Sequence, residues 1–289
     1  MPQWNCTCPN CRDARSGRAK PRTQSCVAIS DSARRWFLVN ASPDLPAQLE
    51  SHPDLQPSPD SPRNSPVSGV LLTNADLDHV LGLLLLREGQ PLEVYATAAV
   101  RRTLEQSLGL TQVLSAFCGI VWHEPPADNF APLVTRADTT SNLLYRSIPL
   151  PGKPPPFNQI AAGKETHSVA YQFYDARTNR RLLIAPDVAG ITDSLLNALK
   201  ESDGVLLDGT FWSADELTTV RPSARSAADM GHVTIRDGTL DLLAGLAARH
   251  KVYIHINNTN PVLAPGSPER AAVEAAGIVV GYDGFEFEL

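Results

Sequence analysis

Polar side chains able to bind a metal gather at predicted strand ends of this 289-residue chain. Asp78 and His79 follow the apolar segment 68–74, Asp187 follows a predicted strand in IAPDVAG, and His255 follows another in VYIHIN. Strand ends that lead into loops are where α/β proteins usually place their chemistry. Carboxylate and imidazole ligands suit Zn, Mn or Fe(II), and two histidines with one carboxylate favour non-haem Fe(II).

Each residue also has a structural interpretation. Asp78 could cap the helix that His79 begins, Asp187 could make a turn, and His255 could donate a hydrogen bond inside a core. Because all of them lie at strand ends, we favour metal binding over these separate structural roles. His167, in ETHSV, and His232, in DMGHVT, are further candidates.

Three cysteines form a second candidate site near the amino terminus. Cys6, Cys8 and Cys11 have C-x-C-x2-C spacing, which lets three thiolates converge on one ion. A structural zinc needs a fourth ligand, and no second cysteine pair supplies it. Cys26 and Cys118 are isolated and are expected to be small core residues.

Other polar residues near these strands could support chemistry. Asp208, in DGTFW, could orient a ligand histidine through a hydrogen bond or cap a strand end. The amide-rich segment INNTNP could hold polar substrate groups or turn the chain. No G-x-S-x-G elbow is present, which argues against a serine hydrolase.

Alternating strands and helices must position these residues. Strands are predicted at 34–40, 68–74 and 91–97, in a hairpin over 168–187, at 204–210 and 251–257, and at 278–289. Helices are predicted at 79–89, at 97–110 after a Thr97 cap, at 191–202, at 237–250, and from Ser267 to 277. Seven prolines between Pro43 and Pro66, and the proline-rich segment 149–164, predict loops with little regular structure.

The composition narrows the functional class. A net charge of −6 argues against nucleic acid or an anionic membrane surface as the main partner. The longest apolar run, at 80–86, is too short to cross a bilayer, and the first 20 residues lack a signal-peptide core. We therefore expect a soluble cytoplasmic protein.

Several long sequence blocks resemble the pyrroloquinoline quinone (PQQ) biosynthesis protein B family of the metallo-β-lactamase superfamily. The resemblance runs through nearly the whole chain, in PQWNCTCPNC, RTQSCVAIS, NASPDLPAQ, LDHVLGLLLLREG, DGTFW, MGHVT and HINNTNP…SPER. It implies a single domain over 1–289 with an αββα sandwich fold, a cysteine-rich metal loop at 1–20 and a proline-rich excursion at 43–66. Family members usually carry an extra strand before PQWNC, so a sandwich lacking its usual first strand stays open.

The superfamily signature H-x-H-x-D-H falls on residues 74–79. Asn74 and Asp76 replace its first two histidines, whereas Asp78 and His79 remain. The resemblance implies one metal held by these two residues with Asp187 and His255, rather than a dinuclear hydrolytic centre. It also implies functional roles for further residues: catalytic His232, His167 and Asp208; zinc ligands Cys6, Cys8 and Cys11; and substrate contacts Asn257, Asn258, Asn260 and Arg270. The residue where relatives complete the zinc site with histidine is Asn258.

The implied activity is Fe(II)- and O2-dependent hydroxylation of the tyrosine-derived ring of a small peptide-derived PQQ precursor. The alternatives are soluble binding or transport of PQQ or its precursor towards the periplasm and, disfavoured by the missing histidines, a metal-dependent hydrolase. The expected cofactors are Fe(II) at the active site and a structural zinc, with O2 as co-substrate. A homodimer is left open.

Overall fold

The computed structural model describes residues 1–135, 137–138, 141–160 and 165–289. These form two compact units: a terminal unit of residues 1–24 and 181–289, and a central unit of residues 25–180. The predicted single domain over 1–289 stays a prediction. Within the described part of the chain, no helix combines the length and apolar character needed to cross a membrane.

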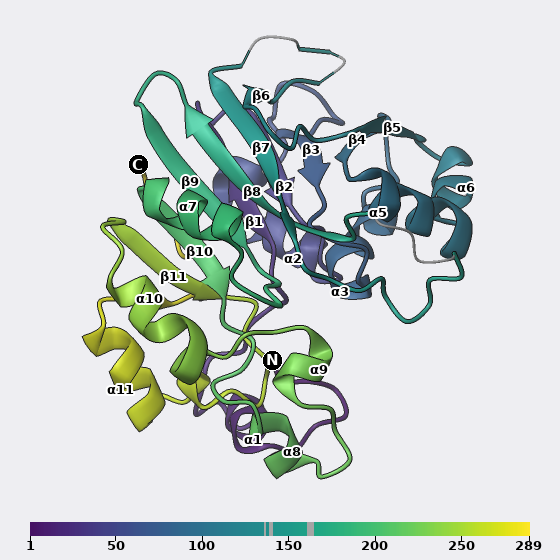
Figure 1. Ribbon diagram of the computed structural model, residues 1–289. Coiled ribbons are helices and arrows are strands. Elements are labelled where there is room, and N and C mark those ends of the chain that lie inside the picture. The colour runs from purple at the N-terminus through teal and green to yellow at the C-terminus, as the bar shows by residue number, and fades with distance from the viewer. Residues whose placement is uncertain (136, 139–140, 161–164) are drawn as a thin grey trace. The chain divides into compact units, whose positions relative to one another are not determined.

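Four parallel strands organise the terminal unit (Figure 1). They are β9 (Arg180–Ala185), β10 (Gly204–Asp208), β11 (His250–Ile254) and β12 (Val279–Val280), in the spatial order β12-β11-β10-β9. Every residue of β10 is buried, which is typical of an inner strand of a parallel sheet. Because the strands are parallel, their carboxyl ends meet at one edge of this sheet.

Helices connect these parallel strands. Helix α7 (Asp193–Glu201) begins at Thr192, whose side chain accepts the Leu195 N–H, and it buries Leu195, Ala198 and Leu199 on one face. Between β10 and β11 lie α8 (Glu216–Val220), α9 (Ala227–Met230), the π-helix η3 (Ile235–Thr239) and α10 (Leu240–Ala244). The 3-10 helix η4 (Pro261–Leu263) and α11 (Pro268–Ala275) lead from β11 to β12.

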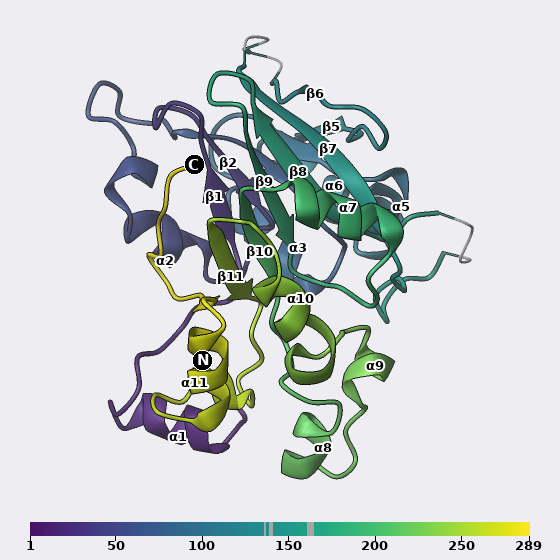
Figure 2. The ribbon, with the colours of Figure 1, turned by 60° about the vertical axis from the view of Figure 1, so that its left-hand side comes forward.

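The amino-terminal residues are tied into the same unit. Helix α1 (Pro9–Arg15), purple in Figure 2, carries Asn10, whose side chain donates to Asn260 O at 2.9 Å. Met1 and Arg22 exchange backbone hydrogen bonds, and the Thr23 N–H donates to the Asp283 carboxylate at 2.9 Å. Segments 260 residues apart in sequence therefore pack together.

The central unit contains a five-stranded sheet in the order β1-β2-β3-β4-β5. Strand β1 (Val27–Ile29) is antiparallel to β2 (Trp36–Val39), and β3 (Val67–Leu71), β4 (Leu92–Tyr95) and β5 (Ile120–His123) run parallel to β2. A core including Leu38, Val70 and Val94 packs the sheet against the helices of this unit. Those helices are α2 (Leu45–Glu50), η1 (Pro53–Leu55), α3 (Leu77–Val80), α4 (Gly82–Leu85), α5 (Ala98–Arg102), the π-helix η2 (Thr103–Ser107) and α6 (Leu110–Ser115).

Three antiparallel strands complete the central unit. They are β6 (Ala131–Pro132), β7 (Leu143–Leu150) and β8 (Ser168–Asp175). The turn after β8 is closed by the Asn179 N–H, which donates to Asp175 O at 2.9 Å, as expected from the ARTN sequence. The predicted irregular segment 149–164 is irregular over 151–160, and its last four residues lie outside the described chain.

Five predicted elements are corrected by the structure. The proline-rich stretch 43–66 contains α2 and η1, because Pro46 and Pro53 occupy first-turn positions where a missing N–H costs nothing. The helix predicted at 79–89 is two short helices ending at Leu85, and those predicted at 97–110 and 237–250 each include a π-helical segment. The terminal strand predicted over 278–289 is limited to β12.

Gly82 explains the break between α3 and α4. A Cβ at Gly82 would lie 2.5 Å from Ser42 O, and the Gly82 N–H donates to Ala41 O at 2.9 Å. The Ala41 N–H in turn donates to His79 O at 2.7 Å. The loop after β2 is therefore held directly against the corner that carries Asp78 and His79.

Candidate metal centre

The carboxyl ends of β9, β10 and β11 bring three predicted site residues of the terminal unit together. Asp208 is the last residue of β10 and pairs in register with Ile254 of β11. His255 follows Ile254 directly, and Asp187 lies two residues beyond the end of β9. The predicted clustering of these residues at one sheet edge is thus observed.

Asp208 is the hydrogen-bonding centre of this cluster. Its fully buried carboxylate accepts the Val188 N–H at 2.9 Å and the Thr210 N–H at 2.9 Å. It also accepts the Thr210 hydroxyl at 2.6 Å and lies 2.7 Å from His232 Nδ1. Burial raises the pKa of Asp208, but the charges and hydrogen bonds of its partners, above all His232, outweigh burial and lower it.

His232 is positioned by two backbone contacts. His232 follows α9, and its backbone N–H donates at 3.0 Å to the carbonyl oxygen of Ala227, the first residue of that helix. The following Val233 N–H donates to Val188 O at 2.7 Å. Burial lowers the pKa of His232, whereas the Asp208 and Asp187 carboxylates raise it, and the net shift is upward. With Nδ1–H donated to Asp208, Nε2 is directed to the side where Asp187 Oδ1 lies 3.9 Å away.

Thr210 sets the orientation of His255. The Thr210 hydroxyl has one proton, and its shortest contact is the 2.6 Å bond to Asp208. The hydroxyl oxygen, 2.9 Å from His255 Nδ1, then accepts the ring N–H, so the ring's lone pair is on Nε2. His255 has φ +57°, a left-handed conformation that costs of order 1 kcal/mol and is typical of functional sites.

Asp187, His232 and His255 form a group with metal-binding geometry. One ligand atom from each lies within 4.8 Å of the others. Two imidazoles oriented by a buried acid and a hydroxyl are the arrangement that metal-binding histidines require. The donor chemistry fits Zn²⁺ or Fe(II).

The Asp78–His79 corner of the central unit carries a second set of oriented donors. His79 Nδ1 lies 2.9 Å from Asn74 Oδ1, and Thr73 Oγ1 lies 3.3 Å from the same nitrogen. Because Asn74 Oδ1 also accepts the Asp76 N–H at 2.9 Å, it is an acceptor, so His79 donates its Nδ1–H and the lone pair is on Nε2. Asp78 Oδ2 lies 3.9 Å from that Nε2.

Asn74 therefore supports His79 within the altered signature. Asn40 also belongs to this arrangement: its φ of +65° and its bonds to the Thr73 N–H and hydroxyl fix the neighbouring strand end. The helix cap is Asp76 rather than Asp78, which lies in the first turn.

The three cysteine sulfurs converge as predicted. The thiols of Cys6, Cys8 and Cys11 lie within 4.8 Å of one another, and Asn258 Nδ2 lies 3.3, 3.5 and 3.5 Å from them. The buried Asn10 side chain donates to Asn258 O at 3.0 Å, which fixes the loop. Burial raises the pKa of Cys8 to about 11, whereas hydrogen bonds, led by the Cys8 N–H, outweigh burial and lower that of Cys6.

The other predicted residues lie in varied surroundings. His167 precedes β8 in the central unit, and burial followed by the charge of Arg102 lowers its pKa. Asn257 donates to the Thr259 hydroxyl at 2.6 Å, and the fully buried Asn260 donates to Gly209 O at 2.9 Å. Substrate contacts by these asparagines and catalysis by His167 stay predictions.

Two supporting residues were missed from the sequence. No feature of the sequence predicted a role for Thr210 in the site, apart from its position shortly after Asp208. Glu216 is buried and accepts the Trp212 N–H at 2.7 Å and the Thr259 hydroxyl at 2.6 Å, joining the loops after β10 and β11. Burial raises the pKa of Glu216 to about 7.

Comparison with known proteins gives a consistent family assignment. Residues 35–256 match the beta-lactamase superfamily domain. The chain is 43% identical to coenzyme PQQ synthesis protein B from Cupriavidus necator over 100% of its length and 95% of the relative's. It is 38% identical to the protein of that name from Pseudomonas aeruginosa, covering 100% of this chain and 96% of the relative.

Solved structures agree with this assignment. Zn²⁺-bound PqqB from Methylobacterium extorquens superposes with a TM-score of 0.88 at 35% identity, covering 100% of this chain and 95% of that one. A diphosphatase of the PhnP family, at 18% identity and a TM-score of 0.65 over 99% of this chain and 90% of that one, shares the fold. The predicted metallo-β-lactamase fold is confirmed.

Proposed function

The chain belongs to the coenzyme PQQ synthesis protein B family, and from this premise we propose that it hydroxylates a PQQ precursor. PQQ biosynthesis follows from the family. The further step is Fe(II)- and O2-dependent hydroxylation of the tyrosine-derived ring of a small peptide-derived precursor.

The observation that carries this proposal is the group Asp187, His232 and His255, in which Asp187 and His255 are proposed ligands and His232 is their neighbour. His79 would add the second imidazole, and two histidines with a carboxylate are the donor set that non-haem Fe(II) oxygenases use. The imidazoles of His232 and His255 are fixed through Nδ1, to Asp208 and Thr210 respectively. A metal bound by donors fixed in this way would keep coordination positions open for substrate.

The proposed ligands are Asp78, His79, Asp187 and His255, as the superfamily signature implies. Bound iron would supply the activation of O2. His232 Nε2, beside Asp187, would hold or release a proton during the reaction, and Asp208 would keep the His232 ring in place. Asn74 would hold His79 in the tautomer that exposes Nε2 to the metal.

The altered signature argues against an ordinary dinuclear hydrolase. Asn74 donates no imidazole, and its side-chain oxygen is engaged by His79 and the Asp76 N–H. A dinuclear site uses two metals to clamp a water nucleophile, which needs the histidines that positions 74 and 76 lack.

We also propose a structural zinc at Cys6, Cys8 and Cys11 with Asn258 as the fourth ligand. Amide oxygen and nitrogen are interchangeable by rotation of the carboxamide, so Asn258 Oδ1 can face the sulfurs in place of Nδ2. Three thiolates and this oxygen would supply the four ligands that a tetrahedral structural zinc takes.

Metal analysis of anaerobically purified protein tests both sites at once. We expect His255→Ala to lose iron and Cys8→Ala to lose zinc, while each keeps the other metal. Loss of the same metal from both variants would contradict the assignment of two sites.

Turnover is tested with the peptide-derived precursor. Hydroxylation inserts one oxygen atom of O2 and releases the other as water, consuming two electrons and two protons, so the assay includes ascorbate as reductant. We expect oxygen uptake with the iron-loaded protein and none with His255→Ala. Tight PQQ binding by metal-free protein without oxygen uptake would instead support a soluble carrier.

A further inference from the structure

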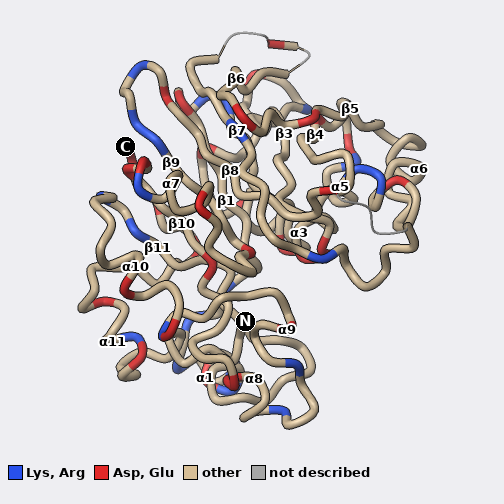
Figure 3. Tube along the Cα trace, in the orientation of Figure 1, with Lys and Arg blue, Asp and Glu red and all other residues tan. Residues whose placement is uncertain are grey.

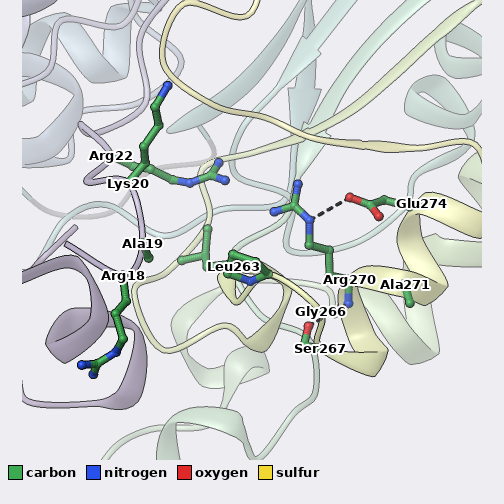
Figure 4. A pocket seen from close by; sticks show the side chains of 11 residues that line it. Arg18, Ala19, Lys20, Arg22, Leu263, Gly266, Ser267, Arg270, Ala271 and Glu274 are labelled. Carbon is green, nitrogen blue, oxygen red and sulfur yellow. Dashed lines mark hydrogen bonds and ion pairs between the residues drawn. The ribbon is translucent and has the colours of Figure 1, made fainter. Parts of the chain in front are cut away.

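A cavity of about 410 Å³ in the terminal unit lies apart from the elements that build the metal centre. It is lined on one side by residues 18–22, which follow α1, and on the other by residues 263–274, from the end of η4 through α11. Figure 4 shows the lining side chains, among them Arg18, Lys20, Arg22, Ser267, Arg270 and Glu274. Its volume falls in the range of small-molecule sites.

Like charges face each other across this cavity. Figure 4 shows the guanidinium groups of Arg22 and Arg270 turned toward one another, whereas the amino group of Lys20 points away from Arg270. Burial lowers the pKa of Arg22, and the positive charge of Arg270 lowers it further, against the opposite effect of Asp283. Two cations that repel each other across a cavity are stabilised when an anion occupies the space between them.

Arg22 Nη1 donates to Gly281 O and Arg270 Nε donates to Glu274, so the remaining N–H groups of both guanidinium groups can bind a ligand. Glu274 is the lining residue with a negative charge, and it accepts Arg270 Nε at 2.7 Å with its side chain 55% exposed. Exposed pairs of this kind are weak, so a ligand can displace Glu274. Arg18 pairs with Asp13 and turns away from the cavity.

The charge of the cavity is local. The chain as a whole carries a net charge of −6, and Figure 3 shows acidic and basic residues intermixed along the trace of this unit. The cavity, with three or four cationic side chains around it, is therefore more positively charged than the rest of this unit's surface.

We propose that Arg22, Arg270 and Lys20 form a binding site for a small anion with at least two acidic groups. Each guanidinium can hold one carboxylate or phosphate through paired hydrogen bonds. A ligand with two such groups would bridge Arg22 and Arg270, and Lys20 would add positive charge at the edge of the cavity. This site is independent of the proposed iron chemistry.

Calorimetric titration of the metal-loaded protein at low salt tests the proposal. The two probes are tricarballylate, a tricarboxylate, and glycerol 2-phosphate, so that a carboxylate ligand is distinguished from a phosphate ligand. We expect saturable binding of at least one probe that weakens about tenfold or more in Arg270→Gln, because a charge-assisted hydrogen bond is lost. Lys20→Gln should weaken it less.

Two matched variants make the test specific. Glu274→Gln should tighten binding severalfold, because it removes the carboxylate that competes for Arg270. Arg236→Gln, an exposed arginine paired with Asp237, should bind as the wild type does. His255→Ala should also bind normally, which excludes the metal centre as the binding site.

The proposal is overturned if neither probe binds at millimolar concentration, or if Arg270→Gln and Glu274→Gln both bind like the wild type. Thermal unfolding of each variant without ligand shows that the fold is retained. His255→Ala lacks the proposed metal ligand, so its anion affinity is measured without the iron chemistry. The anion-binding result can therefore be interpreted even if the proposed hydroxylation is disproved.

Discussion

Thr210→Val is the most informative single substitution in the metal centre. Thr210 is 5% exposed, and its hydroxyl joins Asp208 Oδ1 at 2.6 Å to His255 Nδ1 at 2.9 Å. Valine is close to threonine in size but cannot make either bond. His255 would lose the contact that fixes its ring and its tautomer.

The expected loss follows from the two hydrogen bonds. A bond to a charged group contributes about 1.5–3 kcal/mol and a neutral bond about 0.5–1.5 kcal/mol. Asp208 keeps the Thr210 and Val188 N–H bonds, so we expect the free energy of unfolding of metal-free protein to fall by about 2–4 kcal/mol. Metal affinity should fall about 10- to 100-fold, as is typical when a group that orients a ligand is removed.

The assay compares urea unfolding and competitive metal titration for wild type, Thr210→Val and Thr210→Ser. Serine keeps the hydroxyl, so Thr210→Ser should retain most of the affinity. Thr103→Val is a matched control in the central unit, where a buried threonine donates to Ala99 O at 3.0 Å. It should lose stability but not metal affinity. Metal binding by Thr210→Val within twofold of the wild type would refute the role assigned to this hydroxyl.

Three further predictions test other parts of the account. Burial raises the pKa of Glu216 from 4.5 to about 7, so folding favours its protonated form, and wild-type stability should fall as pH rises through this window. Glutamine does not titrate, so the free energy of unfolding of Glu216→Gln, measured in urea, should fall by up to about 3 kcal/mol less than that of the wild type over this pH range. Identical pH profiles for the two proteins would contradict the raised pKa of Glu216. Asn258→His should tighten zinc binding and Asn258→Ala should weaken it, measured by chelator competition; equal affinities would exclude Asn258 as a ligand. Gly209→Ala should lower the thermal midpoint, because its Cβ would lie 2.8 Å from Tyr253 Cβ and overpacking costs about 1–3 kcal/mol; an unchanged midpoint would show that β10 and β11 can separate there.

The candidate site was predictable where it depends on strand ends. A polar residue at or just beyond the end of a buried apolar strand has a defined place in a parallel sheet, and Asp187, Asp208 and His255 all follow this pattern. The cysteine spacing was equally informative, because C-x-C-x2-C turns tightly enough to bring three sulfurs together.

Contacts between distant segments were not predictable. Thr210 and Glu216 serve the site through partners 43–45 residues away, and no local pattern marks such pairs. The same holds for Gly82, whose packing against the loop after β2 breaks a helix that its apolar sequence would continue. At the carboxyl terminus, alternating aromatic and acidic residues favoured a strand, but pairing with β11 extends only to Val280.

Isotope labelling tests the central claim most directly. The iron-loaded protein is incubated with the peptide-derived precursor, ascorbate and ¹⁸O2 in ordinary water, and the product is analysed by mass spectrometry. The account predicts one heavy oxygen atom on the tyrosine-derived ring, with no product from His255→Ala. Oxygen derived from water, or equal turnover by the His255→Ala variant, would contradict the assignment of an O2-dependent hydroxylase.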